Sequence, residues 1–221
     1  MEERTVPTGV AIRDAREQLF DAAERVLLQH GPSGLTSRAV TTEAGVAKGV
    51  LHRHFADFDA FLVEFVLDRM ARIDTQAAAL QEAVGTGTVV DNLTGILTEL
   101  FGAVTLAIIR LVLARDELLT RLRQARPARM PILSDATAMI TSYLVTEREL
   151  GRIAVDADIE TLAPMLVGTG HLLFADQEGA PPGTGVHKVV TTVIGDVEHE
   201  GPERRLGAIP PSTGAVLSAG T

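Results

Sequence analysis

Cysteine is absent from the sequence. This absence excludes disulfide frameworks, metal sites built on thiolates and cysteine nucleophiles. Long apolar runs are also absent: the longest, LFGAVTLAIIRLVLA, is interrupted by Arg110 and is too short for a membrane span. The first residues, MEERTVPTGVAIRDAREQ, mix acidic and basic side chains without an apolar segment, so they do not resemble a secretory signal. We therefore expect a soluble, cytoplasmic protein.

Positive charge is scarce. The chain has 20 Lys and Arg against 29 Asp and Glu, a formal net charge of −9, which argues against a general nucleic-acid binder. Residues 1–55, however, hold seven basic and seven acidic residues, so the negative excess lies entirely in the rest of the chain. Because phosphate binding depends on local charge, residues 1–55 are the better candidate for a DNA contact. Lysine is especially rare and occurs only as Lys48 and Lys188.

The residues that are present have the composition of a globular protein, with 46% hydrophobic and 22% charged residues. A length of 221 residues allows one large domain or two small ones. Apolar residues recur at helical spacing along the chain, which predicts an all-α fold. The predicted helices cover 12–29, 37–44, 47–54, 57–85, 91–114, 115–125, 131–150, 157–176 and 185–199.

Several predicted boundaries carry residues that stop or start helices. The segment HGPSG (30–34) ends the first helix, since Gly and Pro cannot continue it. Thr36 or Ser37 is the candidate N-cap of the second helix, and Gly45 supplies a tight turn after it. Asp57 is the candidate cap of the long helix that follows.

Three later segments need a choice between structures. The β-branched residues of VHKVVTTVIGDV (186–197) favour a strand, but its apolar positions form a helical stripe, and we predict a helix. Pro164 falls inside the helix 157–176 and predicts a kink or a local break there. Residues 201–221 have the composition of a disordered tail.

The segment TTEAGVAKGVLHRHF (41–55) has three candidate chemistries. A metal site is disfavoured because His52 and His54 would point about 200° apart on a helix. A phosphate loop needs G-x-x-x-x-G-K-[ST], and GVAKGV lacks that order. A short helix, a glycine turn and a second short helix packed on helix 12–29 would instead form a three-helix unit whose last helix enters a major groove. In that unit Leu51 and Phe55 face the core.

The longer segment GLTSRAVTTEAGVAKGVLHRHFADFDAFL (34–62) resembles the helix-turn-helix pattern of the tetracycline-repressor-like (TetR) family of bacterial transcriptional regulators. The matching residues are Gly34, Leu35, Thr36, Ala44, Gly45, Val46, Gly49, Leu51, His54, Phe55 and Leu62 or its neighbour Phe61. The number of ordered matches makes the resemblance specific. Residues 147–174 resemble, more loosely, the late helices of the family that precede and form its dimer interface.

The resemblance implies an N-terminal three-helix helix-turn-helix DNA-binding domain (1–56), joined by a long helix to a helical ligand-binding and dimerisation domain (57–200). The DNA-binding residues that it implies are Ser37, Arg38, Lys48, Gly49, Val50, His52 and Arg53. Arg13 and Arg16 are expected to flank the groove.

The chain departs from the family pattern at three positions. His52 stands where the family usually has a Tyr that touches a DNA phosphate, and Phe58 stands where it usually has a Lys. Val50 stands where Thr or Ser is typical. Loss of the cation at position 58 would weaken sequence-independent affinity and flatten its salt dependence by about one counterion.

The resemblance also implies a homodimer, formed through helices 157–176 and 185–199, in which Gly168 and Gly170 allow close packing. An apolar small-molecule effector would bind among helices 91–114, 131–150 and 157–176. The candidate pocket residues, which core packing explains equally well, are Phe101, Ile108, Met139, Tyr143, Met165, Thr169 and His171. No metal or cofactor is implied.

Two function hypotheses follow. The first is a ligand-responsive homodimeric repressor that binds a palindromic DNA operator. The second is a small-molecule-binding or protein-interaction module of the same fold with weakened DNA binding, motivated by His52 and Phe58. An enzyme is not expected, because no catalytic constellation is visible. The arginines of 110–129 are interspersed with acidic residues, and we expect them to form a solvated surface rather than a second DNA contact.

Overall fold

The computed structural model describes residues 9–126, 131–175 and 183–198. These residues form ten α-helices and no strand beyond one isolated bridge, in agreement with the predicted all-α fold. The helices are α1 (Gly9–Gly34), α2 (Ser37–Glu43), α3 (Gly49–His54), α4 (Phe58–Glu82), α5 (Val89–Leu100), α6 (Ala103–Leu113), α7 (Asp116–Ala125), α8 (Pro131–Glu149), α9 (Ile159–Ala175) and α10 (Gly183–Ile194). The predicted tail at 201–221 lies outside the described residues.

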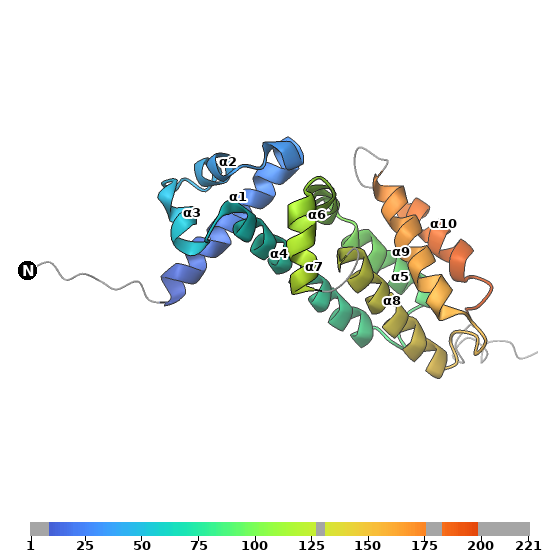
Figure 1. Ribbon diagram of the computed structural model, residues 1–221. Helices are drawn as coiled ribbons and strands as arrows, with labels where there is room; N and C mark the ends of the chain where they lie inside the picture. Colours follow the sequence, from blue (N-terminus) through green and yellow to red (C-terminus); the bar gives the residue numbers. More distant parts are fainter. Residues whose placement is uncertain (1–8, 127–130, 176–182, 199–221) are drawn as a thin grey trace, which may run out of the picture.

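Figure 1 shows two groups of helices. The first group is α1–α3, at one end of the molecule, and the second group is α5–α10, with α8–α10 at the other end. Helix α4 runs between the groups because it buries apolar side chains along its whole length. Phe61 and Phe65 pack near the first group, where both contact Phe20 of α1. Met70 and Leu80, further along α4, are buried within the second group. Helices α6 and α7 lie beside the middle of α4, and α6 also packs on α1.

The helix ends in the first group follow the residues that the sequence indicated. Gly31, with φ of 67°, interrupts α1 in a conformation that glycine adopts without strain. Thr36 is the N-cap of α2, and its Oγ1 accepts a hydrogen bond from the Ala39 N–H at 3.2 Å. Gly45 also has φ of 67° and turns the chain towards α3. Asp57 caps α4 by accepting from the Ala60 N–H at 2.6 Å.

The prediction of a single helix over 91–114 is wrong. The chain bends by 57° between α5 and α6, at Phe101 and Gly102. Phe101 is buried, and Gly102 has the low helix propensity that permits a break. Both halves are apolar, so hydrophobic periodicity alone does not show the bend. Among the described residues no single helix is long and apolar enough to cross a membrane, and α5 with α6 meets that test only as this bent pair.

The C-terminal helices agree with the sequence in one respect and differ in another. Residues 186–194 are helical, within α10, as their apolar stripe predicts. Helix α9 is continuous through Pro164, so the predicted local break does not occur. Pro164 is exposed and lies in the second turn of the helix. Asp158, directly before α9, accepts a hydrogen bond from the Thr161 N–H at 3.2 Å.

Candidate nucleic-acid interface

An aromatic cluster fixes α3 against α1 and α4. The Phe20 ring lies 5.8 Å from the Phe55 ring and 5.6 Å from the Phe61 ring, and the last two are 5.0 Å apart, measured between centroids. Such pairs contribute about 0.5–1.5 kcal/mol each beyond burial of their area. Leu51 and Phe55 are both buried, which confirms the inner face of α3 predicted from the sequence.

Polar contacts from α1 set the position of α2. The Gln18 side-chain amide donates to the Ala44 carbonyl at 2.9 Å, next to the turn that leads to α3. The Arg25 guanidinium pairs with the Glu43 carboxylate at 2.6 Å. Glu43 is the only acidic residue of α2, so this pair offsets the one negative charge on that helix. Helix α1 therefore both orients α2 and limits its repulsion of a polyanion.

The outer side of α3 carries most of the predicted DNA-binding residues. Regular helix begins at Gly49, with Lys48 at the N-cap position and no side-chain bond to the cap. Lys48, Gly49, His52 and Arg53 are exposed. Val50 is half-buried and packs against the core of the unit. The structure thus brings four of the five residues predicted on this segment to one exposed surface.

The two predicted residues on α2 differ in their exposure. Arg38 is exposed in the first turn of the helix. Ser37 is half-buried, and its Oγ is covered and has no hydrogen-bond partner among the described residues. Arg38 can therefore reach an external phosphate directly, whereas the Ser37 hydroxyl needs a change of rotamer.

Arg16, expected to flank the groove, is half-buried and makes contacts within the unit. Its guanidinium pairs with the Glu64 carboxylate of α4 and donates to the His54 carbonyl at 3.3 Å. It also lies 4.5 Å from the centroid of the Phe55 ring, a cation–π geometry. Arg16 therefore joins α1 to α3 and α4. The side chain of Arg13 lies outside the described ones.

Phe58, at the position where the family pattern has Lys, is part of the packing. Its ring stacks on Phe61, with centroids 5.6 Å apart and planes 18° apart. The Arg115 guanidinium, which comes from the start of α7, lies 5.8 Å from the centroid of the Phe58 ring. The first residue of α4 thus contacts the second group of helices rather than presenting a charge. Among the described residues, no three His, Cys, Asp or Glu side chains form a group that could hold a metal ion.

This three-helix arrangement matches a known protein family. The sequence model of the bacterial regulatory proteins, tetR family, matches residues 19–65. This range covers α1 from residue 19 to its end, all of α2 and α3, and the first turns of α4. Residues 19–65 therefore carry the N-terminal unit of the TetR family. Regulators of this family bind DNA and are not enzymes, in agreement with the expectation from the sequence.

Solved structures extend the TetR-family likeness over most of the chain. The reduced form of Escherichia coli NemR is 18% identical, with a TM-score of 0.68 over 86% of this chain and 100% of that one. FadR of Bacillus subtilis, in complex with stearoyl-CoA, is 17% identical, with a TM-score of 0.63 over 82% and 99%. A TetR-family member from Streptomyces coelicolor A3 is 21% identical, with a TM-score of 0.58 over 82% and 98%. These TM-scores show a shared fold. No curated protein matches the sequence.

In this TetR-family fold, four of the predicted ligand-binding residues lie in the core: Phe101, Ile108, Met139 and Tyr143. The Tyr143 hydroxyl accepts from the Asn92 amide at 3.0 Å, so it has the partner that a buried tyrosine requires. Burial, together with the nearby Glu147 carboxylate, raises the pKa of Tyr143.

The other three predicted ligand-binding residues lie on α9, and of these His171 lies beside Phe101. Met165 and Thr169 are exposed on the outer side of the helix. His171 is half-buried, 5.8 Å from the Phe101 ring, and its Nδ1 is covered and has no hydrogen-bond partner among the described residues. Burial and then the charge of Arg110 lower the pKa of His171.

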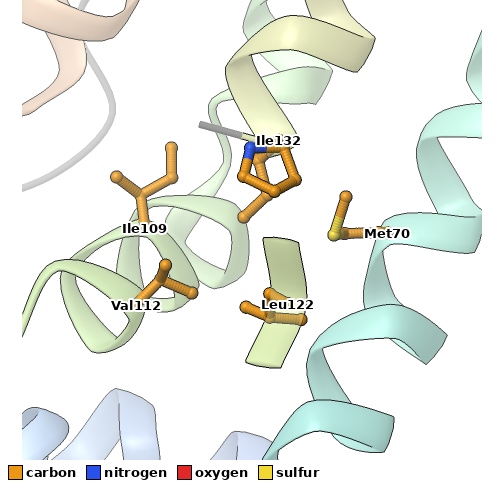
Figure 2. Close-up of a pocket in the computed structure, with 6 residues that line it drawn as sticks. Met70, Ile109, Val112, Leu122 and Ile132 are labelled. Atoms are coloured by element: carbon orange, nitrogen blue, oxygen red, sulfur yellow. The ribbon is translucent and has the colours of Figure 1, made fainter. Parts of the chain in front are cut away.

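A small apolar hollow lies elsewhere in the second group of helices (Figure 2). It has a volume of about 10 Å³ and lies among α4, α6, α7 and α8. Its lining residues are Met70, Ile109, Val112, Leu122, Pro131 and Ile132. The sequence indicated the helices that contain Ile109 and Ile132 but not the contribution of α4 and α7, because those stripes also fit ordinary core packing.

The arginines after position 110 are more engaged than a solvated surface implies. Arg110 donates to the Ala175 carbonyl at 3.2 Å, and Arg126 pairs with Asp135 at 3.2 Å. Arg115 donates to the Leu35 carbonyl at 2.8 Å, across the boundary between the two groups. Arg115 could not be singled out from the sequence, since a lone arginine does not indicate which distant carbonyl it donates to.

Proposed function

We propose that the protein is a homodimeric, effector-responsive transcriptional repressor that binds a palindromic DNA operator. The exposed basic residues Arg38, Lys48 and Arg53, held on α2 and α3 by a rigid aromatic core, carry this proposal. A helix presented in this way enters the major groove, with its first residues nearest to the base edges. The rest of the chain is acidic, so the attraction for phosphate is concentrated on this unit.

The proposed contacts divide by chemistry. Arg38 and Arg53 suit phosphate oxygens or guanine edges, which guanidinium groups bind with two parallel hydrogen bonds. Lys48 lies at the start of α3 beside Gly49, where the missing side chain permits close approach to DNA. His52 and Ser37 offer hydrogen bonds to phosphate, and Val50 contributes mainly through packing. The proposed boundaries are 1–56 for the DNA-binding domain and 57–200 for the other.

A face of α9 that carries no charge after Glu160 supports the proposed dimer. The exposed residues that follow Glu160 on this helix are Thr161, Pro164, Met165, Gly168, Thr169 and Leu172. Met165 is 48% exposed and Leu172 is 63% exposed. Contiguous exposed apolar side chains of this kind mark interaction surfaces. Helix α10 packs beside α9, so the two helices from each of two copies can form a four-helix bundle.

The two glycines of α9 have different parts in this packing. Gly168 is exposed, and a Cβ added there would meet nothing within 4 Å, so it lowers the surface presented to a second copy. Gly170 faces inward, where an added Cβ would lie 3.0 Å from the Phe101 ring. Gly168 alone therefore serves the proposed dimer, and Gly170 serves the packing of α9 on α5 within one chain.

The effector is proposed to be an apolar small molecule. The six residues that line the hollow among α4, α6, α7 and α8 are all apolar. Its volume of about 10 Å³ is far below the usual range for ligand sites, so a bound molecule would have to push its walls well apart. A protein of the same fold, FadR of Bacillus subtilis, was solved with stearoyl-CoA. Phe101, Ile108 and Met139 are the candidates among the predicted residues for a deeper wall.

Phe58 supports a second candidate function, a module of this fold with weakened DNA binding. Its ring is stacked on Phe61, so the position supplies no cation to the DNA backbone. The two candidates are separated by selecting bound sequences from a random DNA pool at low salt. A palindromic consensus with half-sites one helical turn apart is the result expected of a dimeric repressor. No enrichment by a folded dimer would leave the second candidate.

A further inference from the structure

His52 lies on the outer side of α3, on the same face as Lys48. The two residues are four positions apart, and at about 100° per residue they differ by only about 40° around the helix axis. Both side chains are exposed, whereas Leu51 and Phe55 are buried and hold the helix in this orientation. A helix that enters a groove by its first residues places Lys48 deepest. His52 then lies one turn further out, beside the phosphate backbone.

The carboxylates on the helices that contact α3 are directed to arginines rather than to His52. Three of them form ion pairs: Glu43 with Arg25 at 2.6 Å, Asp57 with Arg121 at 3.5 Å, and Glu64 with Arg16. The charge of Asp59, on α4, also acts on Arg121. Glu17 of α1 is exposed next to Arg16. No ion pair between described side chains includes His52, so its imidazole is available to an external anion.

The other charges that share this surface are positive. Arg38 is exposed on α2, and Lys48 and Arg53 are exposed on either side of His52 along the chain. Histidine is the side chain whose charge ordinarily changes between about pH 5 and 8. A phosphate oxygen against an imidazole favours the protonated ring, in which both nitrogens donate. Proton binding and DNA binding at such a position strengthen each other by the same factor, because linkage is reciprocal.

Two other histidines of the DNA-binding unit are placed differently. His54 is half-buried, with its ring 6.4 Å from the Phe55 ring, and its carbonyl accepts from the Arg16 guanidinium. His30 is exposed, but it is 14 residues beyond Arg16 on α1, or about 21 Å along the helix. Since Arg16 is where α1 contacts the end of α3, His30 lies well away from that helix. His52 is therefore the histidine that the unit presents to phosphate.

We propose that protonation of His52 strengthens DNA binding, so that affinity for the operator rises as the pH falls from about 8 to about 6. The protonated ring donates to a phosphate oxygen and adds a cation to those of Arg38, Lys48 and Arg53. The inference rests on the proposed function and adds a form of regulation to the same surface. Acidification acts on DNA binding without an effector.

Two substitutions that fix the charge at position 52 test this proposal. His52→Gln keeps hydrogen-bonding groups without a charge, and His52→Arg carries a positive charge at every pH tested. His30→Gln is the matched control, since it removes an exposed histidine of the same unit that lies away from α3. Fluorescence anisotropy measures the affinity of each variant at pH 6, 7 and 8 over a salt series. The probes are the selected operator and a random duplex of equal length, and circular dichroism verifies folding at each pH.

Operator affinity of the unsubstituted protein should rise about tenfold or more between pH 8 and pH 6, the effect of adding a charge-assisted hydrogen bond in each half-site. The dependence of affinity on salt should become steeper at pH 6 by about one unit of slope per half-site. His52→Gln should change by less than about twofold over this range and resemble the unsubstituted protein at pH 8. His52→Arg should also change little and resemble it at pH 6. His30→Gln should follow the unsubstituted protein.

Equal pH dependence in His52→Gln and in the unsubstituted protein would overturn the proposal. A loss of affinity in His52→Gln that is the same at every pH would overturn it too, because His52 would then act as a neutral hydrogen-bonding group. Loss of the pH dependence in His30→Gln would place the proton elsewhere. If no operator is selected, the proposed repressor function fails, while binding of the random duplex at low salt still decides whether His52 links DNA affinity to pH.

Discussion

The outer side of α2 and α3 and the outer side of α9 are both exposed, but they differ in chemistry. The first presents Arg38, Lys48 and Arg53, whereas α9 presents Met165 and Leu172 on a face that carries no charge after its first turn. They lie at opposite ends of the molecule in Figure 1. A net charge of −9 describes neither surface. The difference agrees with the two proposed partners, a polyanion for the first surface and a second copy for the other.

The largest expected effect comes from removing the positive charge of the first surface. Arg38→Ala together with Lys48→Ala should lower operator affinity about 100-fold or more and abolish the specific complex, since each such contact contributes about 1–3 kcal/mol. Fluorescence anisotropy over a salt series measures this. Arg72→Ala together with Arg110→Ala, two exposed arginines outside the helix-turn-helix, is the charge-matched control. Unchanged affinity in the first double variant would refute the assigned contacts.

The second surface is broken by giving it the charge it lacks. Met165→Glu together with Leu172→Glu should raise the dissociation constant of the dimer about 100-fold, because unpaired charges would be buried in the interface. Sedimentation equilibrium measures the change. Val155→Glu makes the same kind of substitution at an apolar residue that is 88% exposed and lies outside α9. A dimer that survives the double variant as well as it survives Val155→Glu would place the interface elsewhere.

Phe58→Lys sharpens the comparison by adding a charge where the first surface lacks one. The logarithm of affinity should depend more steeply on the logarithm of salt concentration, by about one unit of slope. Stability should fall by about 0.5–1.5 kcal/mol, because the stack with Phe61 is lost. Phe58→Leu separates the two effects, since it disturbs the stack without adding charge. An unchanged slope in the lysine variant would mean that α4 does not approach the DNA backbone.

The smallest expected effect concerns the cap that positions α2. Thr36→Ala removes the acceptor for the Ala39 N–H and should lower the free energy of unfolding by about 1 kcal/mol in a denaturant titration. Thr36→Ser keeps the hydroxyl and should retain most of that stability. Ser33→Ala, at the end of α1, should have no comparable effect on the free energy of unfolding. Equal losses in the alanine variants at 33 and 36 would contradict the assigned cap.

The N-terminal unit was predictable because its structure depends on residues close together in the chain. Thr36, Gly45 and Asp57 act within a few residues of themselves, so the turn and cap positions follow from the sequence. Leu51 and Phe55 are one helical turn apart, and their common inner face also follows. The residues expected on the outer side are exposed, apart from the half-buried positions Ser37 and Val50.

The second group of helices was less predictable because its apolar residues fit several packings. The bend at Gly102 lies between two apolar helices, and a continuous stripe conceals it. Met165 and Tyr143 both seemed suited to a pocket, yet one is exposed and the other is in the core. Such a difference depends on which neighbouring helix covers each face, and neighbours distant in sequence decide that.

The sequence by itself determined the all-α fold, the helix-turn-helix and the concentration of basic residues on it. These features arise from helical periodicity, local hydrogen bonds and residue type. Only the tertiary structure decided that Arg16 pairs with Glu64, that the Phe58 ring lies beneath the Arg115 guanidinium, and that Arg115 donates to the carbonyl of Leu35. Arg115 and Leu35 are 80 positions apart, and nothing local to either residue specifies the other. Their contact exists because α6 and α7 pack beside α1 and α4.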